Sequence, residues 1–345
     1  MNCNKGRDDM DDKNQKIVFH IVNSIKGGSG KSTVSFFLAD HFNRESDSKA
    51  VIIDLDVNGS SWFNDHKIEN YENNFIQNYF YKPEGILSRE SARIVYRYQD
   101  KDDNNANTDG RIEAYLCDPK KSFHLSEYEL DLFENLISVI IDSIIVQNGN
   151  KENIHIILDM PPSYEEHAAR IVNHLIIDVN SPLYKKHKDK YEIIHHLICD
   201  SAYSHIKLNI NYLINYLLGE SYRSYSNAIK ELLKNNQYGF VFTVNNSRQK
   251  IQKKDYSDTE LSEVKDRIYK AELSSIKKEY ISIAFINSYD FLYATWNECL
   301  ENKATSIPAC RDNNDNCFKV VENMDDAMND FYKTVDGRLK VMMVI

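Results

Sequence analysis

The sequence predicts an α/β protein with a doubly wound, mostly parallel sheet and helices on both faces. Apolar runs of strand length recur along the chain, at residues 16–22, 50–55, 111–116, 154–159, 193–199, 238–244 and 280–286. Such continuous runs are typical of strands covered on both faces, as in a parallel sheet. Segments with helical spacing alternate with them, at residues 32–42, 126–146, 165–176, 206–218, 228–234 and 258–278. This alternation of strand and helix favours a layered α/β fold.

Composition excludes several classes of protein. The chain has 345 residues, of which 42% are hydrophobic and 27% charged, the balance of a globular protein with a core. No stretch approaches the roughly 20 apolar residues of a membrane span, and the polar first 16 residues lack the apolar segment of a secretory signal. Six cysteines without a CxxC pair favour reduced thiols over a zinc ribbon or a disulfide scaffold. We therefore expect a cytoplasmic protein.

The pattern along the chain predicts one domain with a tail and an insertion. Residues 1–15 contain almost no apolar side chain and are expected to form a flexible N-terminal tail. Residues 16–345 form the domain, with an insertion around 64–110 that ends in a polar run at 99–110, expected to be a mobile surface loop. Residues 178–191 are a second polar segment of the same kind.

A glycine-rich turn joins the first predicted strand to the first predicted helix. It reads Lys26-Gly27-Gly28-Ser29-Gly30-Lys31-Ser32-Thr33. Glycines let the backbone approach phosphate oxygens and turn its N–H groups toward them, and the helix N-terminus adds partial positive charge. Lys31 supplies a point charge for the β- and γ-phosphates, and the Ser32 hydroxyl is placed to ligate Mg²⁺. An ordinary strand–turn–helix does not need these residues in this order, so the turn predicts a nucleotide-phosphate site.

The turn departs from the usual G-x-x-x-x-G-K-[ST] pattern at its first position, where the chain has Ile25 instead of glycine. The residues present, K-G-G-x-G-K-S from Lys26 onward, are the deviant Walker A signature, and in them the chain resembles the ParA/MinD family of P-loop ATPases. The resemblance implies that the turn binds ATP. It also implies that Lys26 reaches across a dimer interface to the partner protomer's nucleotide.

A second motif follows the next predicted strand, which ends in Asp54-Leu55-Asp56. Because side chains alternate along a strand, both aspartates lie on the same side and can point toward the phosphates. Taken alone, two aspartates at a strand end are more typical of a turn; beside Lys31 they indicate a catalytic strand end. The family writes this stretch DxDPQ, and here Val57-Asn58 replaces Pro-Gln. The resemblance implies that Asp54 belongs to the magnesium and water shell and that Asp56 orients the attacking water.

A third motif, Asp159-Met160-Pro161-Pro162-Ser163, follows the apolar run at 154–159. A carboxylate at the carboxyl end of such a strand is where a Walker B aspartate holds Mg²⁺ through a water. The stretch matches the family's D-x-P-P-S. The two prolines favour an extended turn that can move with the γ-phosphate.

A fourth match lies at the end of the run at 238–244, where Asn245 follows Val244. In ParA-like proteins an asparagine at this place reads adenine, and an amide can both donate to and accept from the edge of that ring. Asn246 is adjacent, so the register stays open. A turn-forming asparagine at a strand end is the alternative.

Other members of the same fold family lack support in this chain. Iron–sulfur carriers need cysteines paired at an interface, and no CxxC occurs. Tyrosine autokinases end in a tyrosine cluster, which the segment 331–345 does not contain. His195 and His196 lie within an apolar run and are expected to pack in the core rather than to bind a ligand.

Two segments bear on the partner. The basic run Arg248, Lys250, Lys253 and Lys254 is usually a solvated face, with contact to nonspecific DNA as the alternative. The net charge of −10 argues against coating of nucleic acid. Residues 338–345 are apolar with two basic residues, but they are short and β-branched, which favours a terminal strand or packed tail over a membrane anchor.

These expectations combine into one hypothesis about function. The chain is an ATPase using ATP and Mg²⁺, forms a homodimer with ATP, and hydrolyses it slowly until a protein partner stimulates it. Its use is to segregate DNA or to position a protein complex. The alternative is a regulatory ATPase subunit of a multi-protein defence, secretion or signalling system acting on an effector. The shared motifs do not separate the two.

Overall fold

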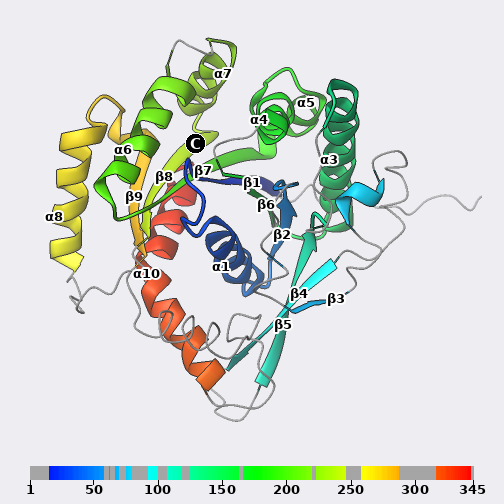
Figure 1. The fold of residues 1–345 in the computed structure, drawn as a ribbon, viewed down its shortest axis with the longest axis horizontal. Coiled ribbons are helices and arrows are strands. Elements are labelled where there is room, and N and C mark those ends of the chain that lie inside the picture. Colours follow the sequence, from blue (N-terminus) through cyan, green and yellow to red (C-terminus); the bar gives the residue numbers. More distant parts are fainter. Residues whose placement is uncertain are drawn as a thin grey trace, which may run out of the picture.

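The protein is described by a computed structural model that covers residues 15–57, 62, 67–69, 75–79, 92–99, 107–118, 125–162, 166–219, 223–245, 258–286 and 316–342. Within these residues nine strands form one sheet in the order β3-β4-β5-β2-β6-β1-β7-β8-β9 (Figure 1). The strands are β1 (Lys16–Asn23), β2 (Ser48–Asp54), β3 (Lys67–Glu69), β4 (Ala92–Gln99), β5 (Asn107–Tyr115), β6 (Asn153–Asp159), β7 (Tyr191–Asp200), β8 (Tyr238–Asn245) and β9 (Ile281–Ile286).

The seven strands from β5 to β9 in this order pair in parallel, and β3 and β4 extend the β5 edge in antiparallel pairing. The predicted doubly wound, mostly parallel sheet is therefore confirmed. In a parallel sheet the carboxyl ends of the strands meet at one edge, and ligands bind there in open α/β sheets. This edge carries the predicted site residues.

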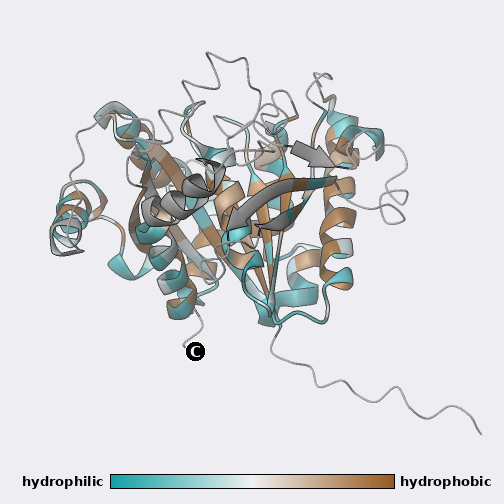
Figure 2. Cartoon of the chain, turned by 90° about the horizontal axis from the view of Figure 1, so that it is seen from below, coloured by the Kyte–Doolittle hydropathy of each residue, from teal (hydrophilic) through white to brown (hydrophobic). Residues whose placement is uncertain are grey.

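Helices cover both faces of the sheet. The helices are α1 (Lys31–Asn43), α3 (Glu127–Gln147), α4 (Glu166–Arg170), α5 (Pro182–His187), α6 (Tyr203–Tyr212), α7 (Arg223–Lys234), α8 (Asp258–Ile268) and α10 (Asn316–Met342). Helices α4, α6 and α8 continue as π-helical segments, Ile171–Ile177, Leu213–Leu217 and Tyr269–Leu273. Helices α1 and α10 share one apolar cluster, and α3, α6 and α7 belong to the other. Hydrophobic strands run through the middle of the molecule between helices with hydrophilic outer surfaces (Figure 2).

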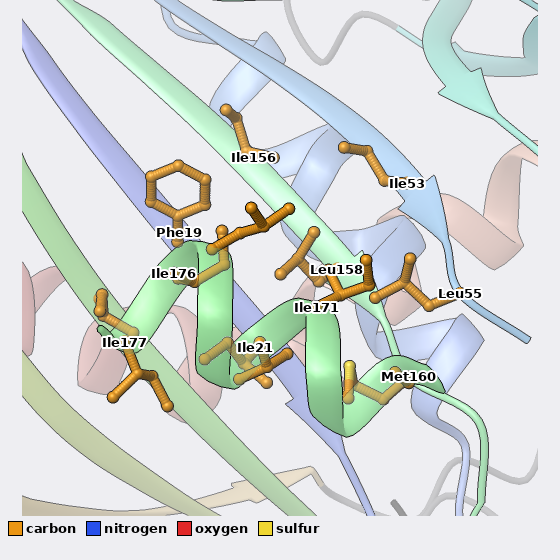
Figure 3. Packing of buried hydrophobic residues seen from close by; sticks show 14 of the residues in the cluster. Phe19, Ile21, Ile53, Leu55, Ile156, Leu158, Met160, Ile171, Ile176 and Ile177 are labelled. Atoms are coloured by element: carbon orange, nitrogen blue, oxygen red, sulfur yellow. The ribbon is translucent and has the colours of Figure 1, made fainter. Parts of the chain in front are cut away.

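The larger cluster shows why the central strands read as unbroken apolar runs. Alternate residues of β1, β2 and β6 point to this face, among them Phe19, Ile53 and Ile156, and the π-helical segment after α4 packs on them (Figure 3). The residues between, such as Val18 and Ile157, point into the second cluster under α1 and α10. Nearly every position of these strands is therefore buried, as expected for a sheet covered on both faces.

The C-terminal segment corrects one expectation. A terminal strand was predicted for residues 338–345, but residues up to Met342 lie in the long helix α10. Met328, Phe331, Val335, Leu339 and Met342 are buried and recur at helical spacing, so the apolar face of this helix outweighs the local β-branched residues. The alternative prediction of a packed tail is confirmed, because these side chains join the cluster over β9 and β8. Among the described residues, no helix has the length and apolar character needed to cross a membrane.

The two polar segments are also more regular than predicted. Gln99 ends β4 and residues 107–110 begin β5, with Gln99 paired to Asn107, so only residues 100–106 of the expected loop fall outside the described part. Antiparallel pairing satisfies the backbone whatever the side chains are. In the second segment the Ser181 hydroxyl accepts from Tyr184 N and caps α5, and Pro182 occupies its first turn.

Three buried histidines lie in a row under α1. His20 on β1 contacts His155 on β6 and His196 on β7, each through ring nitrogens 3.0 Å apart. The outer nitrogen of His196, Nδ1, has no partner among the described residues. A buried lone pair costs less to leave unpaired than a buried N–H. We therefore assign the proton order in which His196 donates to His20 and His20 donates to His155. The prediction that His195 and His196 are packing residues is confirmed, since both are fully buried in the sheet.

Burial lowers the pKa of these rings, because charging them would require a desolvated imidazolium. The pKa of His20 falls to about 3, with the nearby His41 adding repulsion, and burial alone lowers that of His195 to about 3. The pKa values of His155 and His196 also lie well below their usual value.

We expect the free energy of unfolding to fall as the pH drops below about 6.5, because the unfolded chain then binds protons that the folded core refuses. Each such histidine costs about 1.4 kcal/mol per pH unit between its unfolded and folded pKa. His195→Phe should therefore reduce the pH dependence by about that amount. Urea unfolding of both proteins between about pH 7 and pH 5 measures it. Equal pH slopes for the variant and the wild type would contradict this account.

Candidate nucleotide-binding site

The glycine-rich turn between β1 and α1 has the conformation that only glycine adopts freely. Gly28 and Gly30 have φ angles of 77° and 91°, in the left-handed region. A Cβ atom on Gly30 would lie 2.5 Å from Nδ2 of Asn245, so a side chain there would have to displace the Asn245 amide. The turn therefore brings backbone, rather than side chains, to the surface at the carboxyl edge of the sheet.

The start of α1 has the features of an anion site. Gly30 precedes the helix and provides no side chain to cap it, so the positive end of the helix dipole faces the turn. Lys31 opens the helix and is largely buried, and its charge lies close enough to Asp159 to lower the pKa of that carboxyl. The Ser29 hydroxyl is buried and has no partner among the described residues. A buried hydroxyl without an acceptor, just before the N-terminus of a helix, fits a phosphate that would supply that acceptor.

The first carboxylate, Asp54, is buried at the end of β2 and held by backbone donors. Its Oδ1 accepts from Asp56 N at 3.0 Å, and its Oδ2 accepts from Cys117 N at 3.4 Å. Its charge also raises the pKa of the buried Cys117 thiol, after the larger effect of burial. Asp56 itself lies beyond the strand end and is partly exposed, so it is the carboxylate of the pair that solvent reaches.

The second carboxylate, Asp159, lies directly beside Asp54 because β2 and β6 pair in parallel register there. Its Oδ1 accepts from the Ser35 hydroxyl at 3.1 Å and its Oδ2 from the Trp62 indole Nε1 at 3.0 Å. Burial raises the pKa of Asp159 to about 6, against the opposing charge of Lys31 and hydrogen bonds from the hydroxyls of Ser32 and Ser35. Burial therefore makes the charge of this carboxylate costly, and nearby positive charge offsets that cost.

These oxygen donors fit Mg²⁺. The Ser32 hydroxyl and the carboxylates of Asp54 and Asp159 are hard ligands of the kind that Mg²⁺ prefers. Within the described part of the chain, no three His, Cys, Asp or Glu side chains form a complete metal cage. Mg²⁺ ordinarily keeps waters and takes substrate phosphates as ligands, so such a partial set is what a nucleotide-linked metal requires.

Lys26 does not lie with the rest of the loop. Its side chain is exposed, and its Nζ donates to Nε2 of His205 on α6 at 2.5 Å. Because the ammonium group can only donate, His205 carries its proton on Nδ1, which lies 2.6 Å from Oδ2 of Asp200. Ile25 N also donates to Asn209 Oδ1 of the same helix at 3.3 Å. The first part of the turn is therefore attached to α6.

Asn245 lies at the end of β8, where the sequence places it, and its side chain contacts the loop. Its Nδ2 donates to the carbonyl of Ser29 at 2.9 Å, and the residue is buried. In this structure the amide therefore braces the glycine turn. Asn246, the alternative adenine reader, lies outside the described residues, as do Asn58, Ser163, the basic run at 248–254 and residues 1–14.

Sequence reasoning missed several residues of this site. Ser35 follows Lys31 by one helical turn, so its position on the same face was readable from spacing. Trp62, His205 and Asp200 gave no such signal. Trp62 lies 97 residues before its partner Asp159, and His205 lies 179 residues after its partner Lys26. Only the tertiary structure brings these residues together.

A strand, a glycine turn with a buried lysine, a helix and two acidic strand ends together define a P-loop nucleotide-binding protein. The family model of the CobQ/CobB/MinD/ParA nucleotide binding domain matches residues 20–344. The chain therefore belongs to this family, which confirms the resemblance read from the motifs.

Among solved structures, the chain resembles pNOB8 ParA bound to nonspecific DNA, with 12% identity, a TM-score of 0.40 and coverage of 94% of this chain and 99% of that one. It resembles a ParA family ATPase from Chlorobium tepidum TLS, with 11% identity, a TM-score of 0.42 and coverage of 90% and 98%. It also resembles the MinC:MinD cell division protein complex of Aquifex aeolicus, with 14% identity, a TM-score of 0.36 and coverage of 89% of this chain and 96% of that one. No curated protein matches the chain.

Replacing Lys31 with alanine should weaken ATP binding about 10- to 100-fold, since charged hydrogen bonds of this kind contribute about 1.5–3 kcal/mol each. Calorimetric titration measures the affinity. Lys151→Ala is the matched control, because it removes the same charge just before β6, at the opposite edge of the sheet. Equal affinities of the Lys31 variant and the wild type would refute the phosphate site.

Proposed function

We propose that this chain is a magnesium-dependent ATPase that dimerises with ATP and separates after hydrolysis to ADP and phosphate. The observation that carries the proposal is the placement of the two lysines of the turn. Lys31 is buried against its own site, whereas Lys26 stands exposed at the start of the loop. An exposed lysine next to a phosphate loop has the reach and the charge to contact a nucleotide held by a second copy.

The residues of one protomer bind and orient the nucleotide. The backbone N–H groups of the turn and the start of α1 hold the phosphates, with Lys31 neutralising their charge. The buried carboxylates of Asp54 and Asp159 lie side by side at the ends of their strands. Mg²⁺, when bound there, supplies positive charge to the phosphate oxygens. Asn245 keeps the turn in shape through its contact with Ser29, and the register of adenine recognition stays between Asn245 and Asn246.

Asp56 is the residue that orients water for hydrolysis. It is partly exposed and begins where β2 ends, and its backbone N–H is fixed by Asp54. A carboxylate held this way can accept a hydrogen bond from a water in line with the γ-phosphate. Asp54, whose two oxygens both accept backbone hydrogen bonds, has less freedom for that role.

Dimerisation requires Lys26 to leave His205. In the present structure its ammonium group is engaged within its own chain. The free energy gained from the phosphates of a second protomer must therefore exceed the free energy of the hydrogen bond between Lys26 and His205. That cost is small, because the bond lies on a partly exposed surface. A protein partner that favours the released lysine would stimulate hydrolysis. The output we propose is segregation of DNA or positioning of a protein complex, carried by whatever surface recognises the ATP-bound dimer.

Asp56→Ala should still bind ATP but hydrolyse it about 10²- to 10⁴-fold more slowly, the usual loss when a positioned acid–base group is removed. Steady-state phosphate release and ATP titration give the two quantities. Normal turnover in Asp56→Ala together with loss in Asp54→Ala would mean that the two roles are exchanged.

Lys26→Ala should abolish the ATP-dependent dimer. In an Asp56→Ala background, where ATP persists, light scattering should give a dimer with ATP and a monomer with ADP. Adding Lys26→Ala should leave a monomer with both nucleotides. Lys207→Ala is a suitable control, because Lys207 is an exposed lysine of α6 that contacts Tyr203 instead of the loop. A dimer that ignores both nucleotide and Lys26 would refute the switch while leaving the phosphate site intact.

A further inference from the structure

The carboxylate of Asp159 accepts hydrogen bonds from donors that come from different parts of the chain. On one oxygen is the Ser35 hydroxyl of α1, and on the other is the indole N–H of Trp62. Trp62 is almost fully buried, as is Asp159. Trp62 follows Asp56 by six residues, so it belongs to the segment of the chain that comes after β2. The segment after Asp56 is therefore connected to the Asp159 motif through the Asp159 carboxylate itself.

The indole ring has a second, structural reason to be buried. Its apolar body belongs to the cluster formed by α1, α10 and the strands beneath them. A buried tryptophan usually finds an acceptor for its N–H, and a backbone carbonyl would serve as well. Here the acceptor is instead the carboxylate that the site needs, at 3.0 Å. The indole nitrogen can only donate, so its contact with Asp159 Oδ2 always requires that oxygen to accept.

Two further contacts join the same two segments. Leu55 N donates to the carbonyl of Asp159 at 2.9 Å. His167, on the helix that follows the third motif, bonds through Nε2 to the Leu55 carbonyl at 2.8 Å. These backbone contacts fix how the strand ends lie relative to each other. Of the contacts between these two segments, the one from Trp62 reaches the carboxylate itself, so a change in the position of Trp62 changes the hydrogen bonding of Asp159 directly.

We propose that Trp62 is a positioning residue, which orients the Asp159 carboxylate toward the magnesium ion and links that carboxylate to the segment carrying Asp56. The inference rests on the proposed function, because it assumes a nucleotide-linked magnesium ion. Outer partners of metal-binding groups typically change metal affinity by about 10- to 100-fold when they are removed. Trp62→Phe removes the N–H and keeps a smaller aromatic ring in the apolar cluster.

The test is the affinity for a fluorescent ATP analogue, measured with Mg²⁺ and with EDTA. Trp62→Phe should lose about 10-fold or more of the affinity in Mg²⁺ and stay within about twofold of the wild type in EDTA. In an Asp159→Asn background the same substitution should have no further effect, because its target carboxylate is gone. Phe42→Leu is the matched control: it trims the same apolar cluster without touching Asp159, and should change thermal stability but not the Mg²⁺ dependence.

Equal losses with and without Mg²⁺, an unchanged Mg²⁺ affinity, or an effect that persists in Asp159→Asn would each overturn the inference. A wild-type chain whose ATP affinity ignores Mg²⁺ would refute the proposed function as well, which distinguishes the two failures.

If Trp62→Phe does not fold, tryptophan emission tests the same contact. The sequence has two tryptophans, so Trp296→Phe leaves Trp62 alone. Its emission should change when Mg²⁺ is added to the ATP-loaded chain and should not change in Asp159→Asn. Emission indifferent to Mg²⁺ would overturn the inference.

Discussion

In the middle of the sheet, β6 pairs in parallel with β2 on one side and β1 on the other, which sets Asp159 level with both Asp54 and Val22. This register brings the two acidic strand ends and the glycine turn to one edge. A shift of one residue would turn Asp159 to the opposite face of the sheet. The register is specified by burial, because neighbouring positions of these strands fill two different apolar clusters. Core packing and site geometry are therefore one constraint.

The buried carboxylates at the carboxyl edge of the sheet carry an electrostatic cost. Two carboxylates lie buried next to each other, and burial raises the pKa of Asp159 to about 6. Lys31 offsets part of the cost, and phosphates with a magnesium ion would complete the balance of charge. A ligand that binds such a site stabilises the folded chain. The buried histidine row on the same sheet avoids such a cost by staying neutral.

The local parts of this architecture were readable from the sequence, and the long-range parts were not. The glycine turn, the strand ends at Asp54 and Asp159 and most helices follow from residue type and spacing within short windows. The role of α10 was missed, because a few β-branched residues at the end suggested a strand while the helical spacing extended over the preceding two turns and more. Trp62 and His205 were missed for a different reason: their partners lie far away in sequence, and nothing in the neighbouring residues marks them.

The central claim is that Lys26 acts on the partner's nucleotide rather than on its own, and a mixing experiment tests this most directly. Lys26→Ala lacks the lysine but keeps Asp56, and Asp56→Ala lacks the aspartate but keeps Lys26. If the lysine acts across the interface, a mixed dimer contains one site with both groups, so combining the two inactive variants should restore ATP hydrolysis. The account predicts turnover in the mixture well above the sum of the separate variants. Turnover equal to that sum, at protein concentrations where light scattering shows that the two variants form a mixed dimer with ATP, would contradict it.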